Sequence, residues 1–169
     1  MDILEAIFSR RSIRIYTSKP VSRAVIDEIL KAAMNAPSAG GERPWHFIVL
    51  TDRAILDEIP KFHPYSGMVK QAHAAILVCG DPTLEKHKGY WVLDCAAATQ
   101  NMLLAAHGKG LGTVWCGVYP TEDRIVNFRR LCGLPEHIVP FSLVPLGFPG
   151  EVKQVQDRFD SSRVHDNRW

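Results

Sequence analysis

Three short, almost uninterrupted apolar runs constrain this fold more than any other feature of the chain. They cover residues 45–50, 74–79 and 138–146, and each is bounded on at least one side by glycine or proline. Apolar runs of this length are typical of buried strands, because buried helices usually need ten or more residues. A fourth strand is predicted over residues 111–119. The chain is therefore expected to build a sheet with a buried face.

Segments with helical periodicity separate these runs. Apolar residues recur at helical spacing behind Ser22, a candidate N-cap, and Pro37 ends that segment. Strands and helices do not alternate strictly, so the pattern favours a mixed α+β fold. A helix is predicted over residues 2–10, where Asp2 and Glu5 have capping-box spacing and Ile3, Leu4 and Ile7 form the apolar stripe. Further helices are predicted around residues 55–56, from about 88 to 107, and from Thr121 to Gly133.

Length and composition limit the classes of function. The 169 residues, 46% of them apolar and 22% charged, suit one globular domain, and the formal net charge is only +2. Acidic and basic residues are interleaved, whereas a nucleic-acid module would carry a broad basic stripe. No apolar run is long enough to cross a bilayer, and the acidic N-terminus is unlike a signal peptide. We therefore expect a cytoplasmic protein without nucleic-acid or membrane partners.

Metal and hydrolase signatures are missing. The four cysteines form no C-x-x-C pair, which argues against zinc and fits reduced thiols. The glycines of residues 108–112 have the wrong spacing for a dinucleotide fingerprint and precede a strand. No Walker loop, G-x-S-x-G elbow or H-E-x-x-H helix occurs. We expect no metal site.

The first candidate site is Arg10-Arg11-Ser12-Ile13-Arg14. Guanidinium groups match phosphate geometry and stay charged at any working pH, so this segment suits a phosphate or another delocalised anion. The arginines could equally lie at a helix C-terminus because the helix dipole favours cations there. A second candidate is the loop of residues 36–45, whose small residues would admit a flat ligand; it could also be an ordinary connection.

The last stretch, residues 149–169, differs from the rest. It is polar, with few apolar residues, yet it contains Phe159, Val164 and the terminal Trp169. Such an arm cannot form a core of its own. Either it is disordered, or these residues anchor it on another surface, such as a second subunit.

Taken together, these segments resemble the FMN-dependent nitroreductases, in particular their short members. The resemblance covers the whole chain as a single domain, residues 1–169, with an extended arm over residues 149–169. The motifs that carry it are residues 10–14, Ala36-Pro37-Ser38 with the segment 44–49, Gly110-Leu111-Gly112-Thr113 with Trp115 and Gly117, and residues 146–149 with Arg158 beyond.

The resemblance implies an α+β flavoprotein fold with a mostly antiparallel central sheet flanked by helices. It also implies a homodimer whose C-terminal arms are exchanged and whose two FMN sites lie at the interface. The implied FMN contacts are of three kinds. Arg10, Arg11, Ser12 and Arg14 contact the phosphate, ribityl chain and pyrimidine edge, and Arg158 completes the phosphate clamp. Pro37, Ser38 and Ala39 reach the flavin from the neighbouring subunit, and Gly41 and Arg43 of the same loop are further candidate cofactor-binding residues; the backbone of Trp115, Cys116 and Gly117 lines the ring.

Two positions depart from the family pattern. Gly41 stands where asparagine is common, and Arg43 where glutamine is common. The first change removes a side-chain contact to the flavin. Arg43 either adds positive charge near the site or pairs with Glu42. Cys116 could be a redox thiol, but the lack of a partner cysteine favours a structural role.

The implied activity is ping-pong reduction of nitro compounds or quinones by NADH or NADPH through bound FMN, with the chemistry at the flavin and Arg14 as electrostatic stabiliser. Three alternatives remain open. One is a flavin enzyme with a dedicated substrate, such as a dehalogenase, although the short connection between Cys79 and Lys88 favours an open site. The others are a flavin-storage module without turnover and a nucleic-acid regulator.

Overall fold

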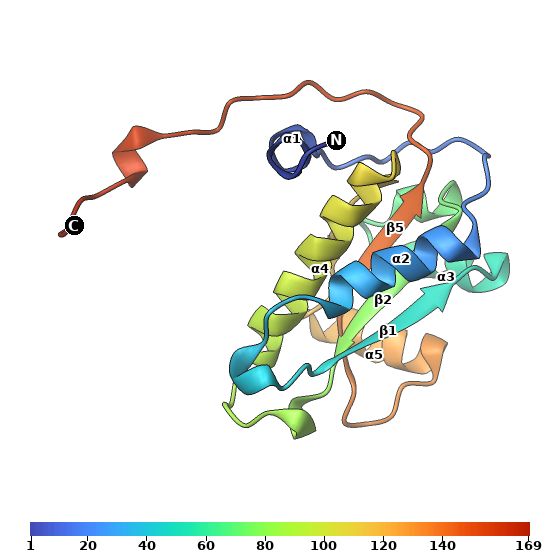
Figure 1. Ribbon diagram of the computed structural model, residues 1–169. Helices are drawn as coiled ribbons and strands as arrows, with labels where there is room; N and C mark the ends of the chain where they lie inside the picture. Colours follow the sequence, from blue (N-terminus) through green and yellow to red (C-terminus); the bar gives the residue numbers. More distant parts are fainter.

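Five strands form one antiparallel sheet in the computed structural model, which describes residues 1–169 (Figure 1). The order is β1-β2-β5-β3, and β4 also pairs with β5. Every ladder between strands is antiparallel, which confirms the predicted fold class. The strands are β1 (Trp45–Leu50), β2 (Ala74–Gly80), β3 (Gly112–Thr113), β4 (Cys116–Gly117) and β5 (Val139–Gly147).

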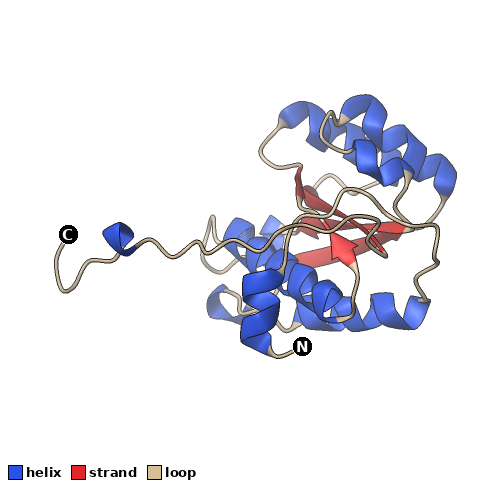
Figure 2. Ribbon diagram, turned by 90° about the horizontal axis from the view of Figure 1, so that it is seen from above, coloured by secondary structure: helices blue, strands red, loops and turns tan.

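Helices cover both faces of the sheet (Figure 2). Successive strand residues point to opposite faces, so β2 contributes Ile76 to one core cluster and Leu77 to the other. Helices α2 and α4 pack over the first face, and α3 and α5 over the second. The helices are α1 (Ile3–Ser9), α2 (Arg23–Met34), α3 (Arg53–Phe62), α4 (Trp91–Gly108) and α5 (Glu122–Cys132).

The predicted helix starts are confirmed in part. The Asp2 carboxylate accepts the Glu5 N–H, and the Ser22 hydroxyl accepts the Val25 N–H. Thr121 occupies the N-cap of α5, but its side chain makes no capping hydrogen bond. Helix α4 begins at Trp91, later than expected, because Gly89 has φ = 89° and the Glu85 carboxylate accepts the Trp91 N–H.

The predicted strand over residues 111–119 is wrong as a continuous element. Only Gly112–Thr113 and Cys116–Gly117 pair with β5, because Val114 and Trp115 leave the ladder between them. The other strands lie within one residue of their expected ends. The interruption turns this edge of the sheet toward a pocket described below.

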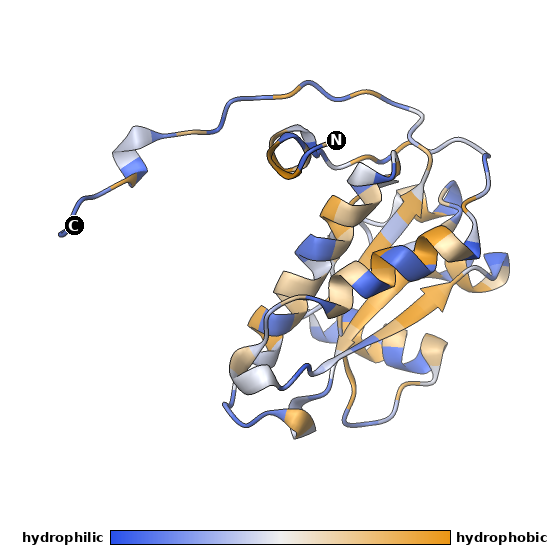
Figure 3. Ribbon diagram, viewed as in Figure 1, coloured by the Kyte–Doolittle hydropathy of each residue, from blue (hydrophilic) through white to orange (hydrophobic).

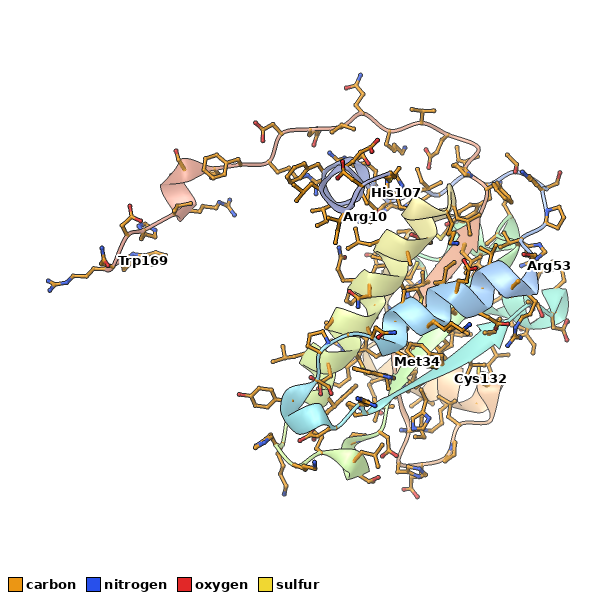
Figure 4. All side chains as sticks on the ribbon, in the orientation of Figure 1. Arg10, Met34, Arg53, His107, Cys132 and Trp169 are labelled. Carbon is orange, nitrogen blue, oxygen red and sulfur yellow. The ribbon has the colours of Figure 1, made fainter.

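Helix α1 and the arm stand outside the two core clusters (Figure 1). The apolar stripe predicted on α1 exists, but Ile3 is 73% exposed and Phe8 63% exposed. The arm carries scattered apolar residues along an otherwise polar path (Figure 3), and Phe159 is 79% exposed. Trp169, at the free end of the arm (Figure 4), is fully exposed, and its ring centroid lies 4.4 Å from that of His165.

None of the helices combines the length and the apolar character required to cross a membrane.

Candidate functional site

The arginine segment is held extended beside β3. The Ile13 N–H donates to the Thr113 carbonyl at 2.9 Å, and Ser12 forms a bridge with Thr113. The Ile13 side chain lies directly on Gly112, where a Cβ atom would fall 2.6 Å from Ile13 Cγ2. Glycine at position 112 therefore allows the segment to approach the sheet closely.

The beginning of the arm returns to the same segment. The Gly150 N–H donates to the Ile15 carbonyl at 2.8 Å, and the Glu151 carboxylate accepts the Arg14 N–H at 2.6 Å. The Lys153 ammonium, followed by the backbone N–H groups of Arg14 and Ile15, donates to this carboxylate and lowers the pKa of Glu151. This arrangement carries Arg158 back toward Arg10.

Arg11 has a different role from its neighbours. Its guanidinium donates to the Gln154 and Gln156 carbonyls of the arm, and to the Phe8 and Arg10 carbonyls at the end of α1. These contacts use the donors that were expected to bind FMN. Arg11 lines the site but serves mainly to tie the arm to α1.

Three other arginines remain free for a ligand. The side chains of Arg10, Arg14 and Arg158 form no hydrogen bond or ion pair within the chain. Arg11, Ser12, Arg14 and Arg158 line one hollow of about 500 Å³, and Arg10, Arg11 and Arg158 line an adjoining one of about 670 Å³. Burial and the nearby positive charges of Arg158 and Arg11 lower the pKa of Arg10. A bound anion would relieve this repulsion.

Arg10 lies beside the end of α4, where His107 is also found (Figure 4). The His107 Nε2 is 2.8 Å from the Ser9 hydroxyl. Burial, followed by the positive charge of Arg10, lowers the pKa of His107. The imidazole therefore responds to charge in the arginine cluster.

Beyond Arg14 lies a more apolar pocket of about 550 Å³. One wall is the interrupted edge of the sheet, and the other is the turn that follows α3. Arg14 lines both this pocket and the arginine-rich hollow, so the two spaces meet at this residue. The lining residues are Arg14, Pro64, Tyr65, Gly67, Met68, Val114, Trp115, Cys116 and Gly117. We call this space the ring pocket.

The thiol of Cys116 is buried in the wall of the ring pocket. Its Sγ–H donates to the Tyr65 carbonyl at 3.6 Å, and burial raises the pKa of the thiol to about 11. The group is therefore protonated at neutral pH, and a thiol is a poor nucleophile in that state. No cysteine of the chain forms a disulfide. These features favour the structural role of Cys116.

The loop of residues 37–43 lies away from the arginine cluster and the ring pocket. Asp94, in the first turn of α4, accepts the Ala39 N–H at 3.0 Å, and Ser38 Oγ accepts the Arg43 N–H at 3.0 Å. Of the two alternatives for Arg43, pairing with Glu42 does not occur, because the Glu42 carboxylate accepts the backbone N–H groups of Lys86 and His87 instead. Arg43 is exposed.

Helix α4 separates this loop from the arginine cluster. The loop is bonded to Asp94, and His107 lies 13 residues further along the same helix, so the two sites are about 20 Å apart along the axis. Within one chain, the structure thus brings together Arg10, Arg11, Ser12, Arg14, Trp115, Cys116, Gly117 and Arg158. It does not bring them together with Pro37, Ser38, Ala39, Gly41 and Arg43.

Sequence reasoning missed the second wall of the ring pocket and the Glu151 contact. Tyr65 and Met68 follow α3 in a short irregular segment without any recognisable motif. Glu151 was one acidic residue in a polar arm. Only its spacing after Gly150, which turns the chain back toward Ile15, could have suggested its contact with Arg14. No group of three histidine, cysteine or acidic side chains is arranged to hold a metal ion.

Comparison with known proteins gives consistent matches over the chain. The model of the nitroreductase family matches residues 7–63 and 61–148. A protein of Methanothermobacter thermautotrophicus, provisionally named an NADH dehydrogenase/NAD(P)H nitroreductase, is 56% identical over 169 residues, covering 100% of this chain and 88% of the relative.

Solved structures agree with this relationship. A protein of the same provisional name from Bacteroides thetaiotaomicron has a TM-score of 0.95 and 44% identity, covering 99% of this chain and 98% of the other. An FMN-dependent nitroreductase from Clostridium difficile has a TM-score of 0.91 and 28% identity, covering 98% of this chain and 99% of the other. The family model and the extent of these alignments lead to one conclusion: this chain belongs to the nitroreductase family, a family of oxidoreductases.

Proposed function

We propose that the chain binds FMN, takes two electrons from NADH or NADPH, and passes them to nitro compounds, quinones or similar small acceptors by a ping-pong mechanism. The observation that carries this proposal is the position of Arg14. It joins a hollow rich in free guanidinium groups to a pocket with apolar and aromatic walls. A cofactor with a phosphate at one end and a flat ring at the other matches this pair of spaces.

The phosphate end is assigned to three free arginines and one hydroxyl. Arg10 and Arg158 supply charge-assisted hydrogen bonds to a phosphate, and Ser12 adds a neutral donor. Arg11 contributes indirectly, by holding the arm that carries Arg158. The arm is thus part of the binding site.

The ring end is assigned to Arg14 and the backbone of residues 115–117. When bound, FMN supplies the hydride chemistry that no side chain of this chain can perform. The Arg14 guanidinium stabilises negative charge that develops in the ring pocket. Trp115 and Cys116 exclude water from the wall, and the Cys116 thiol keeps its proton.

A second copy of the chain completes the proposed site. The loop of residues 37–43 is about 20 Å from the arginine cluster of its own chain along α4, so it is assigned to the flavin of a partner. The exposed apolar side chains of α1 and of the arm support a homodimer in which residues 149–169 wrap the partner. The whole chain, residues 1–169, then acts as a single FMN-binding domain.

The acceptor range is expected to be broad. The connection between β2 and α4 holds only one short turn of 3-10 helix, Pro82–Leu84, and it is bonded to the loop of residues 37–43 that is assigned to the partner's site, so it brings no long insertion to that site. A dehalogenase with a dedicated substrate would need a closed site. Steady-state turnover with a nitroaromatic and a benzoquinone distinguishes the two, since a dedicated enzyme would use neither well.

The first experiment is the visible absorbance spectrum of purified protein, followed by anaerobic addition of NADH or NADPH. Flavin bands that bleach on addition of either reductant support the proposal. Bands that persist favour a flavin-storage module. A colourless protein that also fails to bind added FMN contradicts the proposal, whatever its fold.

A further inference from the structure

The carbonyl of Gly117 accepts hydrogen bonds from two side chains. His63 Nε2 is 2.9 Å from this oxygen, and Arg124 Nη1 donates to it at 2.7 Å. His63 is the residue that follows α3, and Arg124 lies in the first turn of α5. Two helices on one face of the sheet therefore converge on a single peptide of β4. We call this arrangement the Gly117 clamp.

The environment of His63 defines its protonation state. The residue is 1% exposed, and its Nδ1 is buried without a hydrogen-bond partner. Nε2 must carry a proton to donate to the Gly117 carbonyl, so Nδ1 is the unprotonated nitrogen of a neutral ring. Protonation would bury an unpaired N–H group close to the Arg124 guanidinium. Phe128 is the aromatic neighbour from α5 and brings no charge.

The clamp acts on one of the two shortest strands of the sheet. Strand β4 has only two residues and pairs only with β5. Val114 and Trp115, which precede it, leave the ladder and line the ring pocket together with Gly117 itself. Apart from the clamp, the Cys116–Gly117 pairing with β5, the Cys116 thiol contact with Tyr65 and the Val118 and Tyr119 N–H bonds to the Phe141 carbonyl hold this wall.

The same residues also hold the opposite wall. The Ser66 N–H and hydroxyl both donate to the His63 carbonyl, which fixes the turn that presents Tyr65 to the ring pocket. The Arg124 guanidinium lies 5.4 Å from the centroid of the Tyr65 ring, within cation–π range. His63 and Arg124 therefore connect the two walls of the ring pocket, because each contacts Gly117 in one wall and the turn that carries Tyr65 in the other.

We propose that His63 and Arg124 are positioning residues of the ring pocket, and that they set its affinity for the flavin by fixing the orientation of the Cys116–Gly117 wall. This inference rests on the proposed function, because it assigns a flavin to that pocket. Neither side chain touches the ligand; both act through the Gly117 peptide.

The test compares variants that keep or remove one donor. In His63→Gln the amide nitrogen takes the place of Nε2–H, whereas His63→Leu retains apolar bulk without a donor. Arg124→Met removes the second donor. We expect His63→Leu and Arg124→Met each to weaken FMN binding about tenfold and to change the circular dichroism of the bound flavin. His63→Gln should remain within about twofold of the unchanged protein.

Arg129→Met is the matched control. Arg129 lies on the same helix and also donates to backbone carbonyls, those of Glu136 and Ile138, which lie outside the ring pocket. Its loss should lower thermal stability without altering the flavin spectrum or the FMN affinity. A general effect of removing an arginine from α5 would instead weaken FMN binding in both Arg124→Met and Arg129→Met.

The outcomes separate this inference from the proposed function. If the unchanged protein binds no FMN, the proposed function fails. If the unchanged protein binds FMN, and His63→Leu and Arg124→Met both bind it with the same affinity and the same flavin circular dichroism as the unchanged protein, the Gly117 clamp has no positioning role. If His63→Leu does not fold, the inference is tested with Arg124→Met and His63→Gln. An unchanged flavin circular dichroism spectrum in Arg124→Met then overturns the inference.

Discussion

The sheet and the periphery of this molecule bury apolar side chains by different means. Leu77 and Phe128 are fully enclosed by the helices and strands of their own chain, whereas Phe8 and Phe159 are largely exposed. The core is thus complete in one copy. The periphery, formed by α1 and the arm, has apolar residues without a partner surface. This difference agrees with a core that one chain completes and with the proposal that the site needs two.

The largest expected effect is the loss of stability caused by a substitution in the core. Phe128→Ala should lower the free energy of unfolding by about 3–5 kcal/mol, because the ring is fully buried and packs edge-on against Phe62. Phe159→Ala, the matched change in the arm, should alter the unfolding of the monomer by no more than about 0.5 kcal/mol. Urea titration at low protein concentration measures both. Equal effects would remove the distinction between core and periphery.

Truncation after Lys153 tests the periphery directly. It removes Arg158 and the apolar residues of the distal arm, but keeps Glu151, which bonds to the Arg14 backbone. We expect a folded monomer by far-UV circular dichroism and sedimentation, with FMN affinity reduced about a hundredfold. A truncated chain that remains dimeric and retains FMN would show that the arm is dispensable.

Arg14→Ala sharpens the comparison at the point where the two regions meet. Loss of one charge-assisted contact should weaken FMN binding about tenfold and lower the flavin midpoint potential. Arg23→Ala is the control, since Arg23 forms an exposed ion pair with Asp27 on α2. Redox titration of both proteins gives the result. An unchanged potential in Arg14→Ala would remove this residue from its assigned role.

The difference between the core and the periphery also explains which parts of the fold could be predicted from the sequence. The strands of the core were predicted almost to their ends because uninterrupted apolar runs report burial within one chain. The amphipathic pattern of α1 was equally clear, yet no pattern says which surface covers Ile3 or Phe8. The break at Val114 and Trp115 was not predicted, since a β-like composition does not reveal where pairing with β5 stops.

The candidate site divides in a similar way. Motifs identified the arginines because guanidinium groups are rare in such density, and the structure groups Arg10, Arg14 and Arg158 as expected. Arg11 and the Gly117 clamp were beyond sequence reasoning. Both depend on backbone carbonyls, which every residue carries and no motif marks.

The smallest expected effect concerns pH and compares one histidine from each region. Burial lowers the pKa of His63 in the core, and burial together with Arg10 lowers the pKa of His107 beside the arginine cluster. The unfolded chain therefore binds protons at a higher pH than the folded chain does. Stability should be fully present above about pH 6.5 and should fall as the pH drops below that value.

Phosphate distinguishes the two histidines. An anion bound between Arg10 and Arg158 would offset the charge that lowers the pKa of His107, so inorganic phosphate should raise that pKa. His63 faces Arg124 and the Gly117 carbonyl on the other side of the sheet, and its pKa should not change. NMR titration of the imidazole signals, with His63→Gln and His107→Gln for assignment, measures both. A shift of His63 alone, or of neither residue, would mean that the arginine cluster does not bind the anion. A shift confined to His107 would place the anion in the periphery and leave the core electrostatically independent of it.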